Sequence, residues 1–196
     1  GVQTCALPIS ADYYYVKFFD SDNGVIVCGY AKSNDTNESS RIYSTSNGGE
    51  SWDIVGSGPA TNIIKGVVYV SSDVGFFCYD YVEGMDSNLY KTDDGGKTFA
   101  KVMLEEQELD SSAANPQGQE TETKTDSGKN GADSSEQLRW GDVYKEALTP
   151  VVDSTGIITI YLTQGKNAVY NDGKTAAKYQ SSDKGSTWKY IGQIGR

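Results

Sequence analysis

Short runs rich in Val, Ile, Tyr and Phe recur along the chain and are separated by clusters of Gly, Asn, Asp and Ser. Runs of this length and composition favour β-strands, and the polar clusters favour turns. The runs form three groups of four, at 15–19, 25–29, 41–45 and 51–55, at 66–70, 75–81, 88–92 and 98–102, and at 148–152, 157–163, 177–181 and 187–191. The pattern predicts an all-β protein built from three units of four short strands.

A ten-residue motif occurs three times, each time between the third and fourth predicted strands of a unit. It reads YSTSNGGESW at 43–52, YKTDDGGKTF at 90–99 and YQSSDKGSTW at 179–188. We call the shared pattern, S/T-x-D/N-x-G-x-S/T-aromatic, the turn motif. Its members are Thr45, Asn47, Gly49, Ser51 and Trp52, then Thr92, Asp94, Gly96, Thr98 and Phe99, then Ser181, Asp183, Gly185, Thr187 and Trp188.

The chemistry of the turn motif is that of a tight hairpin. Asp or Asn folds its side chain back onto nearby backbone N–H groups. Gly supplies a backbone conformation with positive φ that other residues avoid. The hydroxyl residues can cross-link the loop, and the aromatic residue starts the next strand with a large apolar area. The motif needs no ligand, so its residues are interpreted as structural.

The spacing of the motifs favours a repeat architecture. The first two are 47 residues apart, from Thr45 to Thr92. Four short antiparallel strands in a repeat of about 40–50 residues are typical of a β-propeller blade. The sequence therefore predicts a partial β-propeller of three four-stranded antiparallel blades, at 11–58, 59–104 and 141–196.

The second spacing is longer, because Ser181 lies 89 residues after Thr92. The surplus falls in 105–140, which holds few apolar residues. Between 105 and 137 there are nine acidic residues and two Lys, which account for −7 of the chain's net charge of −10. Such a segment cannot bury enough apolar surface to order itself. We expect a disordered, flexible acidic insert between the second and third blades; a decayed fourth blade is the alternative.

The three motifs resemble Asp boxes, also called BNR repeats, which occur in sialidases and in several unrelated propellers. The stretches FFDSDNGVIVCGY, IYSTSNGGESW and LYKTDDGGKTF are similar to uncharacterised secreted BNR proteins of Gram-positive gut bacteria. The resemblance covers about 13–104 and 141–192, and the first motif departs from it with Asn47 in place of Asp.

The resemblance implies where a ligand would bind. In these propellers the box lies on the face opposite the usual active site. The other face is built by the loops joining strand two to strand three and strand four to the next blade. Here those loops would be the acidic insert together with 30–40, 56–65, 82–88 and 164–176.

Because Asp boxes occur in sialidases, the resemblance also makes sialidase activity a hypothesis to test against the sequence. Sialidases hold the substrate carboxylate with three arginines and use a Tyr nucleophile assisted by a Glu, with an Asp as acid/base. This chain has only Arg41, Arg139 and Arg196, each interpreted as surface charge. We therefore expect no catalytic residues in this chain. It is interpreted as a non-catalytic binding module for a glycan or a cell-surface protein. The alternatives are part of a sialidase-like glycosidase whose catalytic residues lie mostly outside the chain, and a protein-binding propeller resembling photosystem assembly factors or sortilin-type domains.

The amino-acid composition and short motifs argue against nucleic-acid binding, a membrane span and a cofactor or metal site. With 27 acidic residues, 17 basic residues and no His, the chain lacks the basic surface that nucleic acids need. It has no run of about 18 apolar residues that would span a membrane. No cofactor and no metal are expected, because the Asp-Gly and Asn-Gly clusters are turn formers without calcium-loop spacing. Cys28 and Cys78 are interpreted as small buried apolar residues, a disulfide between neighbouring blades being the alternative.

The first residues have a different origin. GVQTCALPI, at 1–9, resembles the translation of a short-read sequencing adapter, so 1–10 is interpreted as a sequencing artefact. The chain is then expected to be a metagenomic fragment of a longer protein that is extracellular or on the cell surface. The outer blades of such a fragment should expose faces that neighbouring blades would cover.

Overall fold

A computed structural model of the chain describes residues 11–30, 40–109, 139–165 and 170–195, and these residues form three antiparallel sheets. Sheet one contains β1 (Tyr13–Phe18), β2 (Gly24–Gly29), β3 (Ser40–Thr45) and β4 (Asp53–Ser57). Sheet two contains β5 (Ile64–Tyr69), β6 (Gly75–Tyr79), β7 (Leu89–Thr92) and β8 (Ala100–Lys101). In each of the two sheets the strands lie side by side in chain order.

Sheet three has five strands, β9 (Glu146–Ala147), β10 (Val151–Val152), β11 (Ile158–Thr163), β12 (Thr175–Ser181) and β13 (Lys189–Gly195). The sequence predicts one first strand over 148–152, but β9 and β10 are separate and both pair with β11. Pro150 lies between them and has no N–H to donate to the ladder, which accounts for the break. The expectation of four strands in this unit is corrected accordingly.

Among the described residues, two short helical segments stand outside the sheets, α1 (Trp140–Val143) before β9 and the 3-10 turn η2 (Tyr170–Gly173) before β12. The predicted acidic insert, 105–140, lies mostly outside the described residues. At its edges, 105–109 are in irregular structure and Trp140 is buried as the first residue of α1.

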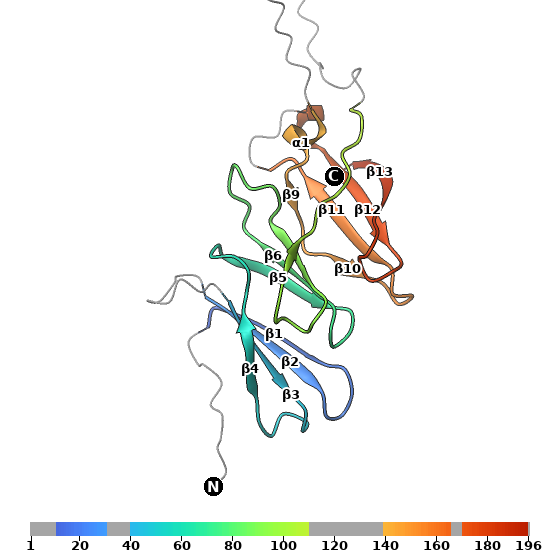
Figure 1. The fold of residues 1–196 in the computed structure, drawn as a ribbon. Helices are drawn as coiled ribbons and strands as arrows, with labels where there is room; N and C mark the ends of the chain where they lie inside the picture. Colours follow the sequence, from blue (N-terminus) through green and yellow to red (C-terminus); the bar gives the residue numbers. More distant parts are fainter. Residues whose placement is uncertain (1–10, 31–39, 110–138, 166–169, 196) are drawn as a thin grey trace, which may run out of the picture.

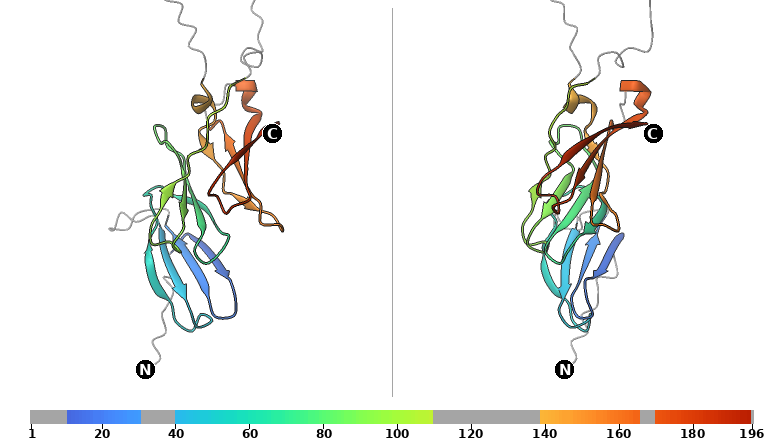
Figure 2. Two further views of the ribbon diagram at one scale, coloured as in Figure 1. Left: turned by 45° about the vertical axis from the view of Figure 1, so that its right-hand side comes forward. Right: turned by 90° about the vertical axis from the view of Figure 1, so that its right-hand side faces the viewer.

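The sheets are stacked face to face in chain order, so that sheet two lies between the other two (Figures 1 and 2). One hydrophobic cluster joins sheets one and two through residues such as Val27, Ile42 and Phe77. A second cluster joins sheets two and three through Phe76, Leu89 and Ile160 among others. Neither cluster includes both outer sheets. The described residues are therefore nearly all β and form an open stack, as in part of a propeller-like β fold.

Hydrogen bonds also connect the sheets across their faces. The backbone N–H groups of Val67 and Tyr69 in β5 donate to the phenol oxygens of Tyr13 and Tyr15 in β1, at 3.1 and 3.0 Å. Each tyrosine thus contributes ring area to the interface and satisfies a backbone group that would otherwise be buried without a partner. These contacts fix sheet one against sheet two.

The two described cysteines, Cys28 and Cys78, are both free and buried. They lie in equivalent central strands, β2 and β6, within fully buried runs. Burial raises the pKa of the Cys78 thiol to about 12. The structure therefore supports their interpretation as buried apolar residues and excludes the disulfide alternative.

Candidate functional site

The turn motif folds in the same way in all three sheets. In sheet two, the Thr92 hydroxyl donates to Asp94 Oδ1 at 2.8 Å and accepts a hydrogen bond from the Gly96 N–H at 2.8 Å. The backbone N–H of Thr98 donates to Asp94 Oδ1 at 2.8 Å, and its hydroxyl donates to Oδ2. Asp94 therefore holds both sides of the hairpin together, and Gly96 has the positive φ of 106° that the turn needs.

The third motif repeats these bonds with Ser181, Asp183, Gly185 and Thr187 at 2.6–2.9 Å. The first motif uses Asn47, whose amide oxygen accepts from Thr45 and from the Ser51 N–H. Its amide nitrogen donates to the Ser51 hydroxyl at 2.9 Å. Asn therefore reproduces the carboxylate's acceptor role and reverses only the direction of the last bond.

The carboxylates of the second and third motifs are stabilised in their ionised form. Hydrogen bonds from the hydroxyl and backbone N–H of Thr98 hold the pKa of Asp94 well below its usual range. Thr187 does the same for the pKa of Asp183. The polar groups of the motifs bond mainly to each other. The structure places these residues in three separate hairpins and does not bring them together into one site.

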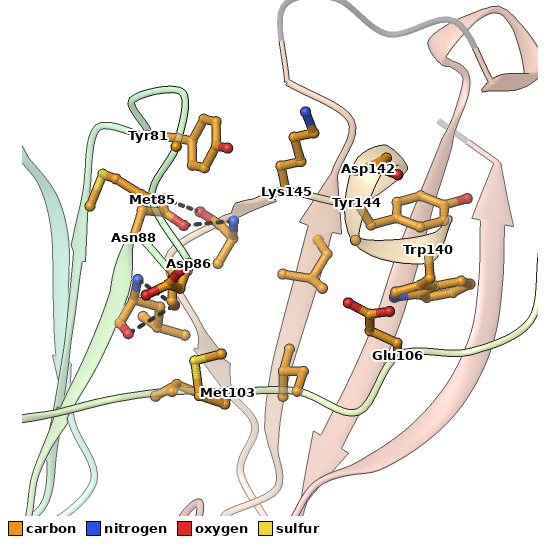
Figure 3. A pocket seen from close by; sticks show the side chains of 18 of the residues that line it. Tyr81, Met85, Asp86, Asn88, Met103, Glu106, Trp140, Asp142, Tyr144 and Lys145 are labelled. Carbon is orange, nitrogen blue, oxygen red and sulfur yellow. Dashed lines mark hydrogen bonds between the residues drawn. The ribbon is translucent and has the colours of Figure 1, made fainter. Parts of the chain in front are cut away.

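A cavity of about 470 Å³ lies at the other end of the strands, between sheets two and three (Figure 3). Its volume falls in the range of pockets that hold small ligands. Three segments line it. The first is the loop joining β6 to β7, the second follows β8, and the third runs from α1 into β9. The lining includes the aromatic, charged and flexible side chains of Tyr81, Glu83, Met85, Asp86, Asn88, Met103, Glu106, Arg139, Trp140, Asp142, Tyr144 and Lys145.

The walls of the cavity have a charged rim and an apolar interior. Leu89, Val102 and Ala147 are buried beneath it, whereas Glu106 and Asp142 are solvent-exposed carboxylates on the side of Trp140. Figure 3 shows these two carboxylates on one side of the cavity and Tyr81 on the other. A ligand here would meet apolar surface below and hydrogen-bond acceptors around its edge.

Two ion pairs restrain the rim. Lys145 Nζ lies 2.8 Å from Glu83 Oε1 and connects sheet three to the β6–β7 loop. Lys101 Nζ lies 2.8 Å from Asp86 Oδ2 within sheet two. Both pairs are largely exposed, so each contributes little to stability. Their effect is to orient two carboxylates beside the cavity.

Asn88 joins the two sheets beneath the cavity. Its side-chain oxygen accepts a hydrogen bond from the Ala147 N–H at 2.9 Å, and its side-chain nitrogen donates to the Ala147 carbonyl at 3.0 Å. The same nitrogen donates to the Tyr79 carbonyl at 2.8 Å. Asn88 is 1 % exposed, so these bonds form in a dry environment where losing them is costly. The side-chain amide of Asn88 thus pairs with the Ala147 backbone as the peptide group of a neighbouring strand would, and it links sheet two to sheet three.

An aromatic cluster supports the α1 side of the cavity. The rings of Trp140 and Tyr144 are 4.6 Å apart, and Trp140 meets Tyr190 edge to face at 5.4 Å. Tyr144 shares a hydrogen bond with the Thr175 hydroxyl at 2.9 Å, and burial raises the pKa of its phenol. A phenol that is held in its neutral form is a poor nucleophile.

The three arginines named from the sequence are not gathered at the cavity. Arg139 is part of its lining, Arg41 lies in β3 of sheet one, and Arg196 is outside the described residues. Across the described ranges, no three side chains of His, Cys, Asp or Glu are grouped so that they could hold a metal ion. Within the same residues, no helix has the length and apolar character that crossing a bilayer requires.

Part of the cavity lining comes from segments named from the sequence, namely the loop 82–88 and the edges of the insert 105–140, whereas Met103, Tyr144 and Lys145 lie outside them. Its individual residues were not predicted. One signal was available: the chain has only two methionines, Met85 and Met103, and both line the cavity. Of the other loops named, 31–39 and 166–169 lie outside the described residues. A smaller cavity, of about 260 Å³, lies between sheets one and two and includes Asp94.

No family model and no curated protein matches this chain. Among solved structures, the chain is similar to a GH74 enzyme of Niastella koreensis, with 15 % sequence identity and a TM-score of 0.43. The match covers 86 % of this chain and 19 % of the enzyme. The chain thus spans about a fifth of that protein's length, and a likeness of this extent assigns it neither a reaction nor a substrate.

Proposed function

We propose that this chain is part of an extracellular or cell-surface Asp-box propeller, a BNR-repeat protein, and that it acts as a non-catalytic binding module for glycans. The observation that carries the proposal is the cavity between sheets two and three. It is concave, has an apolar interior and has carboxylates at its rim. Sugars present both apolar C–H faces and hydroxyl donors, so a site of this composition suits them.

The motif geometry supports the Asp-box part of the proposal. In each hairpin, one Asp or Asn side chain accepts bonds from the preceding hydroxyl and from the backbone two positions after the motif glycine. The motifs lie between the last two strands of each sheet. The cavity is formed by the loops at the opposite strand ends, where such propellers place their ligands.

The non-catalytic part rests on the composition of the cavity. A sialidase needs several arginines around the substrate carboxylate. Among the described lining residues Arg139 is the one arginine. The Tyr144 phenol is buried, with its pKa raised, and bonded to Thr175. A catalytic role would therefore need residues from elsewhere in a longer protein.

The test is a binding measurement on immobilised neutral, amino and sialylated oligosaccharides, followed by titration of the sugars that bind. The variant Met103→Ala/Glu106→Gln changes two exposed lining residues and should weaken binding by about tenfold or more. Val151→Ala/Glu50→Gln makes the same kinds of change at exposed positions outside the cavity and should leave affinity unchanged.

Three results would contradict the proposal. One is an absence of binding to every sugar, and another is equal weakening by both double variants. Release of the fluorophore from a fluorogenic sialoside by the purified chain would favour the sialidase-like alternative. Absence of sugar binding together with binding of a protein partner that Met103→Ala/Glu106→Gln weakens would favour the protein-binding alternative.

A further inference from the structure

The sulfur-containing side chains of this protein differ in their access to solvent. Four lie within the described residues, Cys28, Cys78, Met85 and Met103. The two cysteines are 0 and 2 % exposed. Both methionines line the cavity between sheets two and three. The accessible sulfur of the described residues is therefore concentrated at the cavity.

The two thiols are poor targets for an oxidant. Peroxides react with the thiolate form of cysteine, and they must reach the sulfur to do so. Burial raises the pKa of both thiols, that of Cys78 to about 12, so Cys28 and Cys78 stay protonated at neutral pH. A thioether has no proton to lose, so its oxidation depends on exposure of the sulfur. Oxidation is therefore expected at methionine.

Met103 has the more exposed of the two thioether side chains. It is 63 % exposed, although the residues on either side of it are buried or partly buried. Val102 belongs to the hydrophobic cluster between sheets two and three, and its backbone N–H donates to the Leu89 carbonyl at 2.9 Å. Leu104 packs against the same cluster. The backbone is thus fixed, while the Met103 side chain is accessible to solvent at the cavity (Figure 3).

Met85 is better protected. It is partly buried in the loop joining β6 to β7. Its sulfur accepts a hydrogen bond from the Asn62 side-chain nitrogen at 3.2 Å, and the same nitrogen donates to the Asp80 carbonyl at 3.1 Å. Because oxidation uses a sulfur lone pair, an N–H group bonded to the sulfur slows it. The two thioethers of one cavity therefore differ both in exposure and in hydrogen bonding.

We propose that Met103 is the preferred site at which hydrogen peroxide and small organic hydroperoxides oxidise this chain, and that its sulfoxide weakens ligand binding at the cavity. The first part goes beyond the proposed function and does not depend on it. The second part concerns regulation of the proposed glycan site and rests on that function.

The reaction transfers one oxygen atom. A lone pair of the Met103 sulfur forms the S–O bond while the O–O bond of the peroxide breaks. With hydrogen peroxide, the proton on the transferred oxygen passes to the departing hydroxide, which leaves as water. The sulfur loses two electrons and the peroxide gains two. Methionine sulfoxide reductases reverse the change, so the modification can be removed.

Oxidation changes the surface that a ligand meets. Methionine is flexible and apolar, whereas its sulfoxide is polar and accepts hydrogen bonds. Exposed carboxylates of the lining, those of Asp86, Glu106 and Asp142, already supply acceptors. The sulfoxide therefore replaces apolar contact area with one more acceptor, and the C–H face of a bound sugar loses a contact.

The site of oxidation is tested on the folded full chain without a ligand. After brief treatment with dilute hydrogen peroxide, peptide mass spectrometry locates the gain of one oxygen atom. Met103 should be oxidised about fivefold or more faster than Met85, with Cys28 and Cys78 unmodified. In denaturant the two methionines should react at similar rates. Asn62→Ala should speed the oxidation of Met85 and leave that of Met103 unchanged.

Two results would overturn the assignment of the site. One is an equal rate for Met85 and Met103 in the folded chain. The other is modification of a cysteine before Met103.

The effect on binding is tested by comparing each protein with itself before and after oxidation. The oxidised unaltered chain should bind about threefold or more weakly to the sugars that the untreated chain binds, and reductase treatment should restore the affinity. Met103→Leu keeps an apolar side chain without a thioether, so oxidation should not change its affinity. Met85→Leu is the matched control and should still lose affinity on oxidation. Thermal unfolding should be alike before and after oxidation, which separates a change at the cavity from a lost fold.

An unchanged affinity after oxidation of Met103 would overturn the second part of the proposal, as would a loss of affinity on oxidation of Met103→Leu. If no sugar binds the untreated chain, the proposed function fails and the second part fails with it. The peptide masses still decide the site of oxidation in that case.

Discussion

The two ends of the strands contrast in this molecule. At the motif end, three hairpins of similar sequence have nearly the same hydrogen bonds, and their polar side chains bond mainly within the hairpin. At the cavity end, the loops differ in length and sequence, and exposed carboxylates such as Glu106 and Asp142 surround a concave surface.

The contrast separates residues that build the fold from residues that are available to a ligand. A motif that uses its polar groups within its own turn has few left for binding. A loop that varies between repeats does not need its polar side chains to form the turn, because the sheets on either side already fix its two ends. Those side chains are therefore available to bind a ligand. In this chain, repetition therefore marks architecture, and the differences between repeats mark the candidate site.

The largest expected effect is the loss of stability when alanine replaces a glycine of positive φ, and it should differ between the motif end and the cavity end of the strands. Gly185→Ala at the motif end would place a Cβ 2.5 Å from the buried Phe76 ring, at φ +77°. We expect a loss of about 2–4 kcal/mol in the free energy of unfolding, from backbone strain together with overpacking. Chemical denaturation would measure it.

Gly84→Ala is the matched control at the cavity end. Gly84 has a φ of +91° but no atom within 4 Å of an added Cβ. Only backbone strain remains, so the loss should be about 1 kcal/mol. Equal losses in the two variants would show that the motif end is not the more constrained of the two.

The second effect concerns the bond between sheets two and three. Asn88→Ala leaves the backbone groups of Ala147 and the Tyr79 carbonyl without this partner, and should cost about 2–3 kcal/mol of unfolding free energy. Asn62→Ala is the control, because Asn62 is less buried and donates to a single backbone carbonyl, that of Asp80. If Asn88→Ala costs no more unfolding free energy than Asn62→Ala, then the Asn88 side chain does not hold the two sheets together.

The smallest effect is a pH dependence that the motifs do not share. The pKa values of Asp94 and Asp183 in the fold lie below the ordinary value of about 4, so their stabilisation is present above that pH. It is lost as the pH falls through about 4 toward the lower folded-state value. Asn47 does not titrate and contributes no such dependence.

Thermal unfolding measured between neutral and acidic pH would test this. The double variant Asp94→Asn/Asp183→Asn copies the first motif and should lose less stability on acidification than the unaltered chain. Asp12→Asn/Asp53→Asn changes two aspartates outside the motifs and serves as the control. Identical acid sensitivity of both double variants would show that the motif carboxylates are not the groups responsible.

Much of the fold could be predicted from the sequence because its signals are local. Runs such as 25–29 and 41–45 correspond closely to β2 and β3, since β-branched and aromatic residues bounded by turn formers favour strands. The hairpin chemistry of the turn motif could be written from Asp94, Gly96 and Thr98 alone. The break at Pro150 was not predicted, although a proline within a run is a local signal against a continuous strand. The helix at Trp140 was not predicted because it depends on packing in the aromatic cluster.

The candidate site shows the limit of such reasoning. The loop 82–88 and the insert that contains Glu106 could be named from the resemblance to Asp-box propellers, but Met103 and Lys145 lie outside every loop that was named. Their proximity results from the packing of sheet three on sheet two, which no local pattern encodes.

The sequence by itself thus determined the strands, the turns and their repetition, because these depend on neighbours a few residues apart. The tertiary structure alone decided which loops meet at a cavity and which side chains of each sheet are buried. Both depend on contacts between residues tens of positions apart, and the energy of those contacts comes from burial that exists only once the sheets are stacked.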